Sequence, residues 1–301
     1  MSKVYKIYQV DSFTKEKFAG NPAGVVTKAD GLTDIQMQKI ARELNNSETA
    51  FIFSGKNGEY DVHIRFFTPI REVPICGHAT IAAHYVRAIE MNLGNTRVLQ
   101  KTGAGILPVD IVYDGSDYKI TMTQGAISIH NPLDLKYQDM IIEALGIEKK
   151  DTRDDCPVSI ASTGHSKVMI GIKDIRLLHH LSVNLSKLSE LSCAIGCNGY
   201  YVFTLHPGED ILVHGRMFAP AIGIAEDPVT GNANGPLGAY LVHWGLIPGN
   251  HSEISFQAIQ GEAMGREGKI QVLVKIADNN PIEVQITGEA VITFQTEIEC
   301  Q

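Results

Sequence analysis

The sequence contains two copies of one pattern, set half a chain apart. Residues 65–69 (RFFTP) recur as residues 216–220 (RMFAP), an offset of 151 in a chain of 301 residues. Residues 72–79 (EVPICGHA) recur as residues 226–233 (EDPVTGNA), an offset of 154, with glutamate, proline, glycine and alanine shared. Three inserted residues account for the change of offset. Two matches in the same order indicate two homologous halves, which constrains the fold more than any other feature of the chain.

Periodic patterns predict a strand-rich chain with four helices. The clearest helix begins at the capping box of residues 33–36 (TDIQ). Two others begin at glycines, one at Gly77 and one after Gly231. Pro236 predicts a start near Ala233 for the second, because proline is tolerated in a first turn. The remaining helix covers residues 136–145, and strands are expected at residues 3–10, 60–67, 105–113, 118–122, 167–172, 199–205, 211–218, 269–276 and 283–294.

Composition narrows the function to small-molecule chemistry. The net charge is −8, and no run of five or six basic residues occurs, so nucleic acid and membrane surfaces are not expected partners. No apolar run approaches the roughly 18 residues of a membrane span. The first 20 residues do not read as a secretory signal, which predicts a cytoplasmic protein. Five scattered cysteines are interpreted as free thiols.

Length predicts two domains, joined by a linker within residues 115–135. If the halves are homologous, shared residues build the scaffold, and an ionisable group found in only one half needs another explanation. Glu48 stands opposite Gly199 at offset 151, and Asp227 stands opposite Val73 at offset 154. The ordinary interpretations are a solvated turn or cap for Glu48 and a turn former for Asp227. A carboxylate pair can instead hold different protonation states, one as a base and the other as an acid or orienting group.

The helix starts at Gly77 and Gly231 are a second candidate feature. Unpaired N–H groups in a helix's first turn, together with its dipole, favour an anion, and glycine lets a ligand approach the backbone. Two such starts predict a grip on a carboxylate. The alternative is that both glycines only permit tight turns from strand to helix.

Cys76 and His78 flank the first of these helix starts. A thiolate at Cys76 would benefit from the helix N-terminus. The matching residues of the second half are Thr230 and Asn232, so a symmetric pair of thiols is not available. His78 is either a neutral core residue or a hydrogen-bonding group and proton carrier.

Motifs for the common cofactors are absent from the sequence. It has no phosphate-binding loop, no dinucleotide fingerprint, no serine nucleophile elbow and no zinc-binding helix. The sequence therefore predicts no nucleotide, flavin or metal.

At these residues the chain resembles the phenazine-biosynthesis isomerase (PhzF-like) family. The resemblance implies an α+β fold of the diaminopimelate epimerase type, with two pseudo-repeat domains, each a barrel-like sheet wrapped around a central helix. It places the domains at residues 1–120 with 288–301 and at residues 121–287, within about ten residues, and the active site between them. It also implies a homodimer and no cofactor. The motifs that carry it are residues 18–22 (FAGNP), 47–51 (SETAF), 76–80 (CGHAT), 226–231 (EDPVTG) and 260–261 (QG).

The resemblance also implies roles for the residues that the duplication singled out. Glu48 falls at the family's catalytic acid/base, and His78 and Asp227 fall at polar groups that contact substrate. Gly77 falls where a backbone N–H contacts substrate, and Asn232 stands where the phenazine isomerase has a serine. The catalytic candidates are thus Glu48, His78 and Asp227, and the substrate-binding candidates are Gly77, Gly231, Asn232 and Cys76.

The preferred hypothesis is a cofactor-independent isomerase that moves a proton within a small carboxylic acid, with Glu48 as the acid/base. One alternative is a racemase or dehydratase that uses Cys76 as a single thiol base. Another is a non-catalytic protein that binds small acids.

Overall fold

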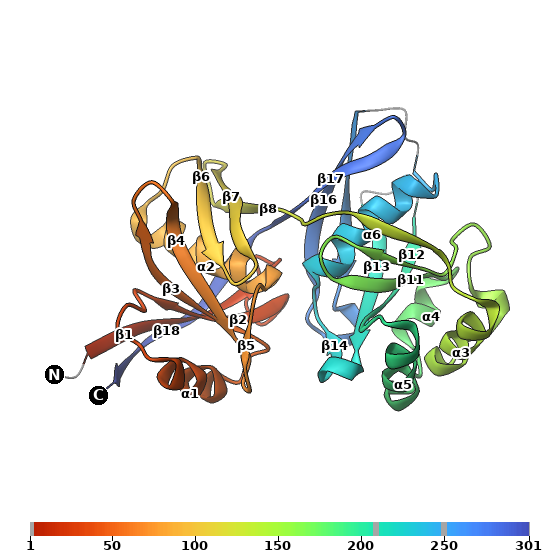
Figure 1. Cartoon of the computed structure of the whole chain (residues 1–301), viewed down its shortest axis with the longest axis horizontal. Helices are drawn as coiled ribbons and strands as arrows, with labels where there is room; N and C mark the ends of the chain where they lie inside the picture. The colour runs from red at the N-terminus through yellow and green to blue at the C-terminus, as the bar shows by residue number, and fades with distance from the viewer. Residues whose placement is uncertain (1–2, 207–210, 248–251, 301) are drawn as a thin grey trace. The chain divides into compact units, whose positions relative to one another are not determined.

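The chain of the computed structural model crosses from one structural unit to a second and then returns (Figure 1). The structure describes residues 3–206, 211–247 and 252–300. Unit 1 comprises Met1–Thr123 and Thr287–Gln301, and unit 2 comprises Gln124–Ile286. Within the described ranges, no helix has the length and apolar character that a membrane span requires.

Unit 1 is a mixed sheet with one largely buried helix (Figure 1). β2 runs parallel to β3, and β4 runs parallel to β6, whereas the remaining pairs of this unit are antiparallel. The last strand, β18, pairs with β1 along its length. The elements are β1 (Lys3–Ser12), β2 (Asn21–Thr27), α1 (Asp34–Leu44), β3 (Thr49–Lys56), β4 (Tyr60–Phe67), β5 (Glu72–Val73), α2 (Gly77–Met91), β6 (Thr96–Thr102), β7 (Gly105–Tyr113), β8 (Tyr118–Thr123) and β18 (Ala290–Cys300).

Unit 2 repeats this connectivity. β11 runs parallel to β12, β13 runs parallel to β15, and α6 occupies the place between strands that α2 has in unit 1. The elements are β9 (Ser128–Pro132), α3 (Leu135–Leu145), η1 (Lys149–Asp151), β10 (Ser159–Ser162), β11 (Ser166–Gly171), α4 (Ile175–His179), α5 (Leu185–Ile195), β12 (Tyr200–Leu205), β13 (Ile211–Ala219), η2 (Pro220–Ile222), β14 (Ile224–Asp227), α6 (Gly231–His243), β15 (Glu253–Gln260), η3 (Glu262–Met264), β16 (Gly268–Ala277) and β17 (Asn280–Gly288).

The strand register confirms the duplication residue by residue. Val73 of β5 lies opposite Phe66 of β4, and Asp227 of β14 lies opposite Met217 of β13. These two pairs carry the offsets of 151 and 154 that the sequence shows, so the three inserted residues lie in the turn between the paired strands. The predicted fold class, an α+β protein made of two pseudo-repeat domains, is therefore confirmed.

One repeated ion pair fastens the turn that precedes each buried helix. Arg65 donates from Nε and Nη2 to the Glu72 carboxylate, with both distances 2.7 Å. Arg216 makes the same two-pronged contact with Glu226, at 2.8 and 2.7 Å. Such bidentate pairs specify geometry as well as charge. Each pair ties β4 to β5 or β13 to β14, and so it fixes where the following helix begins.

The helices α2 and α6 are largely buried because most of their residues are apolar or small, which is typical of a core helix. In α2, 11 of the 15 residues are buried. In α6 the buried set includes Pro236, because the helix begins at Gly231. The predicted start near Ala233 was wrong. Pro236 lacks the N–H that a helix interior uses, and burial of the surrounding apolar residues outweighs this local loss.

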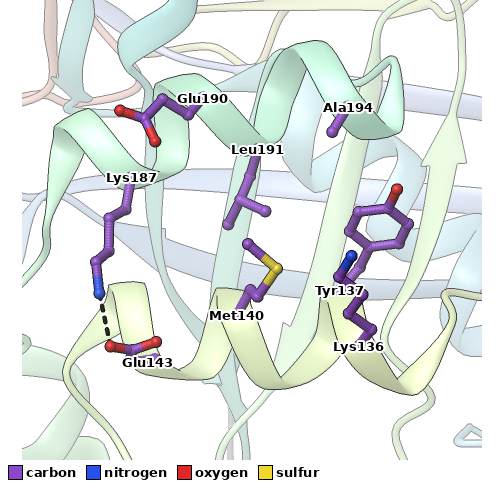
Figure 2. A pocket seen from close by; sticks show the side chains of 8 residues that line it. All are labelled: Lys136, Tyr137, Met140, Glu143, Lys187, Glu190, Leu191 and Ala194. Atoms are coloured by element: carbon purple, nitrogen blue, oxygen red, sulfur yellow. Dashed lines mark hydrogen bonds and ion pairs between the residues drawn. The ribbon is translucent and has the colours of Figure 1, made fainter.

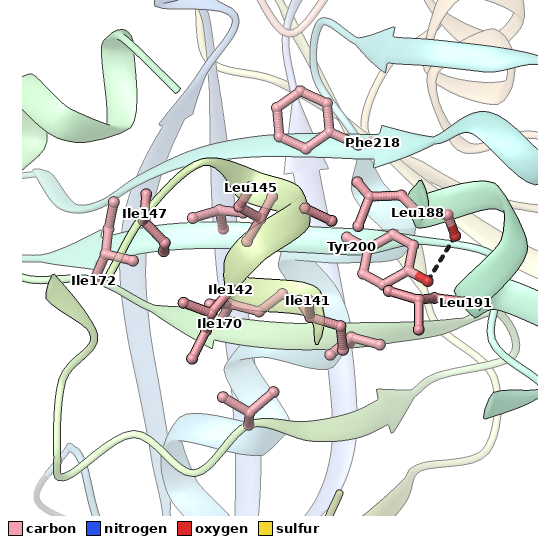
Figure 3. Packing of buried hydrophobic residues seen from close by; sticks show 14 of the residues in the cluster. Ile141, Ile142, Leu145, Ile147, Ile170, Ile172, Leu188, Leu191, Tyr200 and Phe218 are labelled. Atoms are coloured by element: carbon pink, nitrogen blue, oxygen red, sulfur yellow. Dashed lines mark hydrogen bonds between the residues drawn. The ribbon is translucent and has the colours of Figure 1, made fainter. Parts of the chain in front are cut away.

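Two other expectations need correction. The stretch predicted as a linker contains β8 and β9, and within it residues 115–117, 124–127 and 133–134 lie outside helices and strands. The single strand predicted at residues 283–294 is two strands, β17 and β18, which Glu289 separates. The short helix α4 and the amphipathic helix α5 were not predicted. In unit 2, α3 and α5 cover the sheet, where Ile142, Leu145 and Leu188 pack with Ile170 and Tyr200 (Figure 3).

A fully buried histidine in α2 makes the stability of unit 1 depend on pH. Burial lowers the pKa of His84 from 6.5 to about 4, although the contact between its Nε2 and Gln100 opposes the shift. The unfolded chain therefore binds a proton below pH 6.5 that the folded chain does not bind until about pH 4. We expect stability to fall by up to about 3 kcal/mol between these two values. Urea unfolding at several pH values should show a shallower slope in this range for His84→Gln, and an unchanged slope would contradict the assignment.

Candidate functional site

Glu48 lies in the turn that joins α1 to β3 in unit 1. α1 ends at Leu44, and the C-cap residue Asn45 adopts the left-handed conformation. The side-chain amides of Asn46 and Gln9 then exchange two hydrogen bonds, of 2.9 and 2.8 Å. The backbone carbonyl of Glu48 accepts from the N–H of Gly24 at 3.3 Å. The turn is thus anchored on both sides of the carboxylate, whose side chain is 15% exposed.

His78, in the first turn of α2, lies directly beside this carboxylate. Its Nε2 is 3.4 Å from Oε2 of Glu48 and 3.2 Å from Oγ of Ser47. Its backbone carbonyl accepts a hydrogen bond of 2.8 Å from the Ser12 hydroxyl. His78 is therefore held both at its imidazole ring and at its backbone. The structure brings together two residues that lie 30 positions apart in the sequence.

Cys76 is the N-cap residue of α2, and its thiol is buried. Its Sγ lies 3.4 Å from Nδ1 of His78 and makes no cap to the helix. A Cβ added to Gly77 would meet no atom within 4 Å, so open space adjoins the backbone at the helix start. The first N–H groups of α2 have no partner within the helix and lie next to this space.

The donor atoms of Glu48, Cys76 and His78 all lie within 4.8 Å of one another. Oxygen, sulfur and nitrogen form a mixed set that could bind a metal ion such as zinc. The sequence predicted no metal, and that remains a prediction.

Asp227 closes β14 in unit 2 and is 8% exposed. Its Oδ2 accepts a hydrogen bond from the hydroxyl of Thr230, the N-cap residue of α6. Thr230 therefore directs its hydroxyl toward the carboxylate and does not cap the helix. Gly231, which is buried, and Asn232, which is half-buried, follow in the first turn of α6.

Gln260, the last residue of β15, holds this turn from behind. Its Nε2 donates to the backbone carbonyl of Asp227 at 2.7 Å and to the Thr230 hydroxyl at 3.0 Å. Its Oε1 accepts from the Thr230 N–H and from Nδ2 of Asn234, both at 3.1 Å. The partners from the backbone are unambiguous, so they fix the orientation of the amide.

The order of donors through this network assigns a role to Asp227. The Thr230 oxygen accepts from Gln260, so the proton of its hydroxyl is directed at Asp227. Asn234 donates to the Thr230 carbonyl at 3.0 Å and accepts from the buried Tyr201 hydroxyl at 2.7 Å. Asp227 is thus a hydrogen-bond acceptor in this network.

Sequence reasoning missed several residues of these two clusters. No sequence motif pointed to Ser12, Asn234 or Tyr201. Each joins a cluster only through a hydrogen bond that the fold creates. Ser47 and Gln260 lay inside the motifs that carry the family resemblance, but no role was assigned to them. Thr230 was recognised only as the counterpart of Cys76.

Two surface hollows among the described residues lie away from these two clusters. One groove of about 330 Å³ lies between α3 and α5, where Lys187 donates to Glu143 at 2.6 Å and Met140 and Leu191 are among the lining residues (Figure 2). Another of about 320 Å³ lies in unit 1 beside Arg87 and Glu90. Neither contains a predicted site residue.

Comparison with known proteins gives one consistent result. Residues 10–296 match the PhzC-PhzF family, described as phenazine biosynthesis-like protein. An uncharacterized isomerase of Clostridium acetobutylicum is 61% identical, and the match covers 99% of each chain. A trans-2,3-dihydro-3-hydroxyanthranilate isomerase of Pseudomonas fluorescens is 31% identical over 94% of this chain and 95% of that one.

Solved structures agree with these sequence matches. The crystal structure of a Bacillus anthracis phenazine biosynthesis protein of the PhzF family shares 29% identity. It superposes with a TM-score of 0.88 over 98% of this chain and 99% of that chain. The chain therefore belongs to the phenazine biosynthesis-like family, and it is an isomerase of that family.

Proposed function

We propose that the protein moves a proton between two carbons of a small carboxylic acid, with Glu48 as the group that carries the proton. The Glu48 carboxylate takes a proton from one carbon, and the electron pair of that C–H bond enters the adjoining unsaturated system. The resulting carboxylic acid returns the proton to a second carbon, where the new C–H bond forms. The reaction needs no oxidant, reductant or second substrate, because the proton and the electron pair of the first C–H bond are retained in the product.

The observation that carries this proposal is the contact between Glu48 and His78. A base needs a fixed position, and the anchored turn and the imidazole supply it. His78 can donate a hydrogen bond to the carboxylate or to the substrate. Their side chains are 15% and 8% exposed, so the carboxylate is only partly hydrated.

Asp227 has a different task in this proposal. As an acceptor held by Thr230 and Gln260, it orients a hydroxyl or amino group of the substrate. Neither the helix start at Gly77 nor the one at Gly231 has a side-chain cap, so each offers N–H groups suited to an anion, and Asn232 lies in the first turn of α6. In this proposal Glu48 transfers the proton and Asp227 orients the substrate.

A deuterium wash-in screen tests the proposal. The protein is incubated in deuterium oxide with small unsaturated carboxylic acids, beginning with trans-2,3-dihydro-3-hydroxyanthranilate, and products are followed by mass spectrometry and NMR. Isomerisation with deuterium at the new C–H position supports the proposal. Binding of an acid without exchange or isomerisation would favour the non-catalytic alternative.

Cys76 is the discriminating residue for the racemase or dehydratase alternative. We expect Cys76→Ala to retain activity within about threefold and to lose about 1 kcal/mol of stability, because a small buried side chain is truncated. Its counterpart in unit 2 is Thr230, whose hydroxyl is too weak an acid to act in place of a second thiol. Activity on the substrate found in the screen and the urea midpoint are the two measurements. A loss as large as that of Glu48→Gln would establish the thiol as the base.

The proposal also includes the homodimer and the cytoplasmic location predicted from the sequence. Sedimentation velocity of the purified protein and fractionation of the source cells test these two points separately from the chemistry.

A further inference from the structure

Unit 2 contains a buried lysine that the proposed reaction does not use. Lys167, in β11, is 8% exposed. Among the residues that the structure describes, its Nζ has a single acceptor, the carbonyl of the adjacent Ser166 at 3.2 Å. An ammonium has three donors, and lysine is rarely buried without a partner. Two N–H donors are therefore available to a ligand that is not part of the chain.

The duplication shows which place in the fold this side chain occupies. Gly199 accepts from the N–H of Val168 at 2.8 Å, as Glu48 accepts from Gly24 at 3.3 Å. Gly199 is thus the counterpart of Glu48 in the hydrogen-bond pattern as well as in the sequence. The position that has a carboxylate in unit 1 has no side chain in unit 2.

Lys167 fills the space that Gly199 leaves. A Cβ built on Gly199 would lie 2.3 Å from Cδ of Lys167 and 3.4 Å from its Nζ. Any larger residue at 199 would displace the lysine, which explains the glycine. The turn at Glu48 in unit 1 thus carries a carboxylate, and the equivalent turn at Gly199 in unit 2 has the amine of Lys167 beside it.

We propose that Lys167 is an anion-binding residue of unit 2, whose ammonium receives the carboxylate of a small organic acid. The identity of that acid rests on the proposed function, whereas the capacity to bind a carboxylate does not. Equivalent turns of the two units would then carry groups of opposite charge, Glu48 to move a proton in unit 1 and Lys167 to neutralise a bound anion in unit 2.

The surroundings of Lys167 affect how readily its amine is protonated. Burial lowers the pKa of Lys167, while the nearby Cys197 and Asp227 raise it to a smaller extent. Burial lowers the pKa of His165, and the nearby Lys167 lowers it further. A bound carboxylate favours the charged amine, so binding at alkaline pH is accompanied by proton uptake.

Calorimetry with two probes of different charge tests the proposal without turnover. Anthranilate and its neutral amide, 2-aminobenzamide, are titrated into the wild type, Lys167→Met and a matched surface variant, Lys173→Met. Lys173 is an exposed lysine that pairs with Asp154 at 3.8 Å. We expect Lys167→Met to weaken anthranilate binding at least tenfold and to leave the amide unchanged. Lys173→Met should bind both probes within twofold of the wild type.

Proton uptake provides an independent readout. Titrations at alkaline pH in two buffers of different ionisation enthalpy should show uptake for the wild type and none for Lys167→Met. Lys167→Gln repeats the measurement should the methionine variant not fold. Anthranilate binding within twofold of the wild type, or no binding to the wild type at millimolar concentrations, overturns the proposal. Retained turnover in Glu48→Gln would instead overturn the proposed function and leave this inference intact.

Discussion

Replacement of Glu48 by glutamine is expected to lower turnover at least about a thousandfold, while the fold and substrate binding are retained. The amide keeps the size of the side chain and a hydrogen bond to His78, whose Nε2 lies 3.4 Å from the carboxylate. It cannot accept and return a proton. A positioned acid/base contributes about 10²–10⁴-fold, and here the same group would act in both steps.

Steady-state kinetics on the substrate found in the wash-in screen measures this effect. The matched control is Glu43→Gln, which alters an exposed glutamate of α1 five residues away and should leave kcat within twofold. A loss in kcat with little change in KM is expected, because the lost group acts on the transition state. Residual activity above a few per cent would exclude Glu48 as the sole base.

Replacement of Gln260 by alanine is expected to have the largest effect on stability, about 4 kcal/mol. The side chain is 1% exposed and makes four hydrogen bonds to the turn of Asp227 and Thr230 and to Asn234. Its removal leaves buried donors and acceptors without partners and creates a cavity. Urea unfolding measures the change in free energy.

A second variant separates stability from positioning. Gln260→Glu keeps the shape but places an oxygen against the Asp227 carbonyl and the Thr230 hydroxyl, where Nε2 now donates. We expect kcat/KM to fall by more than tenfold even at temperatures where the variant is folded. Gln271→Ala, which removes an exposed amide from β16, should change neither quantity. Normal kinetics in folded Gln260→Glu would show that Gln260 is only a structural residue.

The features that the sequence determined by itself are local or repeated. The capping box at Thr33 is present in α1, and Gly146 closes α3 in the left-handed conformation, because caps depend on a few adjacent residues. The duplication was readable because both copies keep the arginine, glutamate and glycine that build the strand pair and the helix start. That repeat led to the two-unit fold and to Glu48 and Asp227 as the unmatched acids.

Only the tertiary structure decided which side chains meet. Gln260 reaches Asp227 across 33 positions, and Ser12 reaches the carbonyl of His78 across 66. Lys167 can occupy its buried position only because Gly199 has no side chain there. Periodicity reports which face of an element is apolar, but hydrogen bonds between elements depend on packing and register, which no local pattern contains. For the same reason α6 retains Pro236, since burial in the core of unit 2 outweighs a preference that acts over one turn.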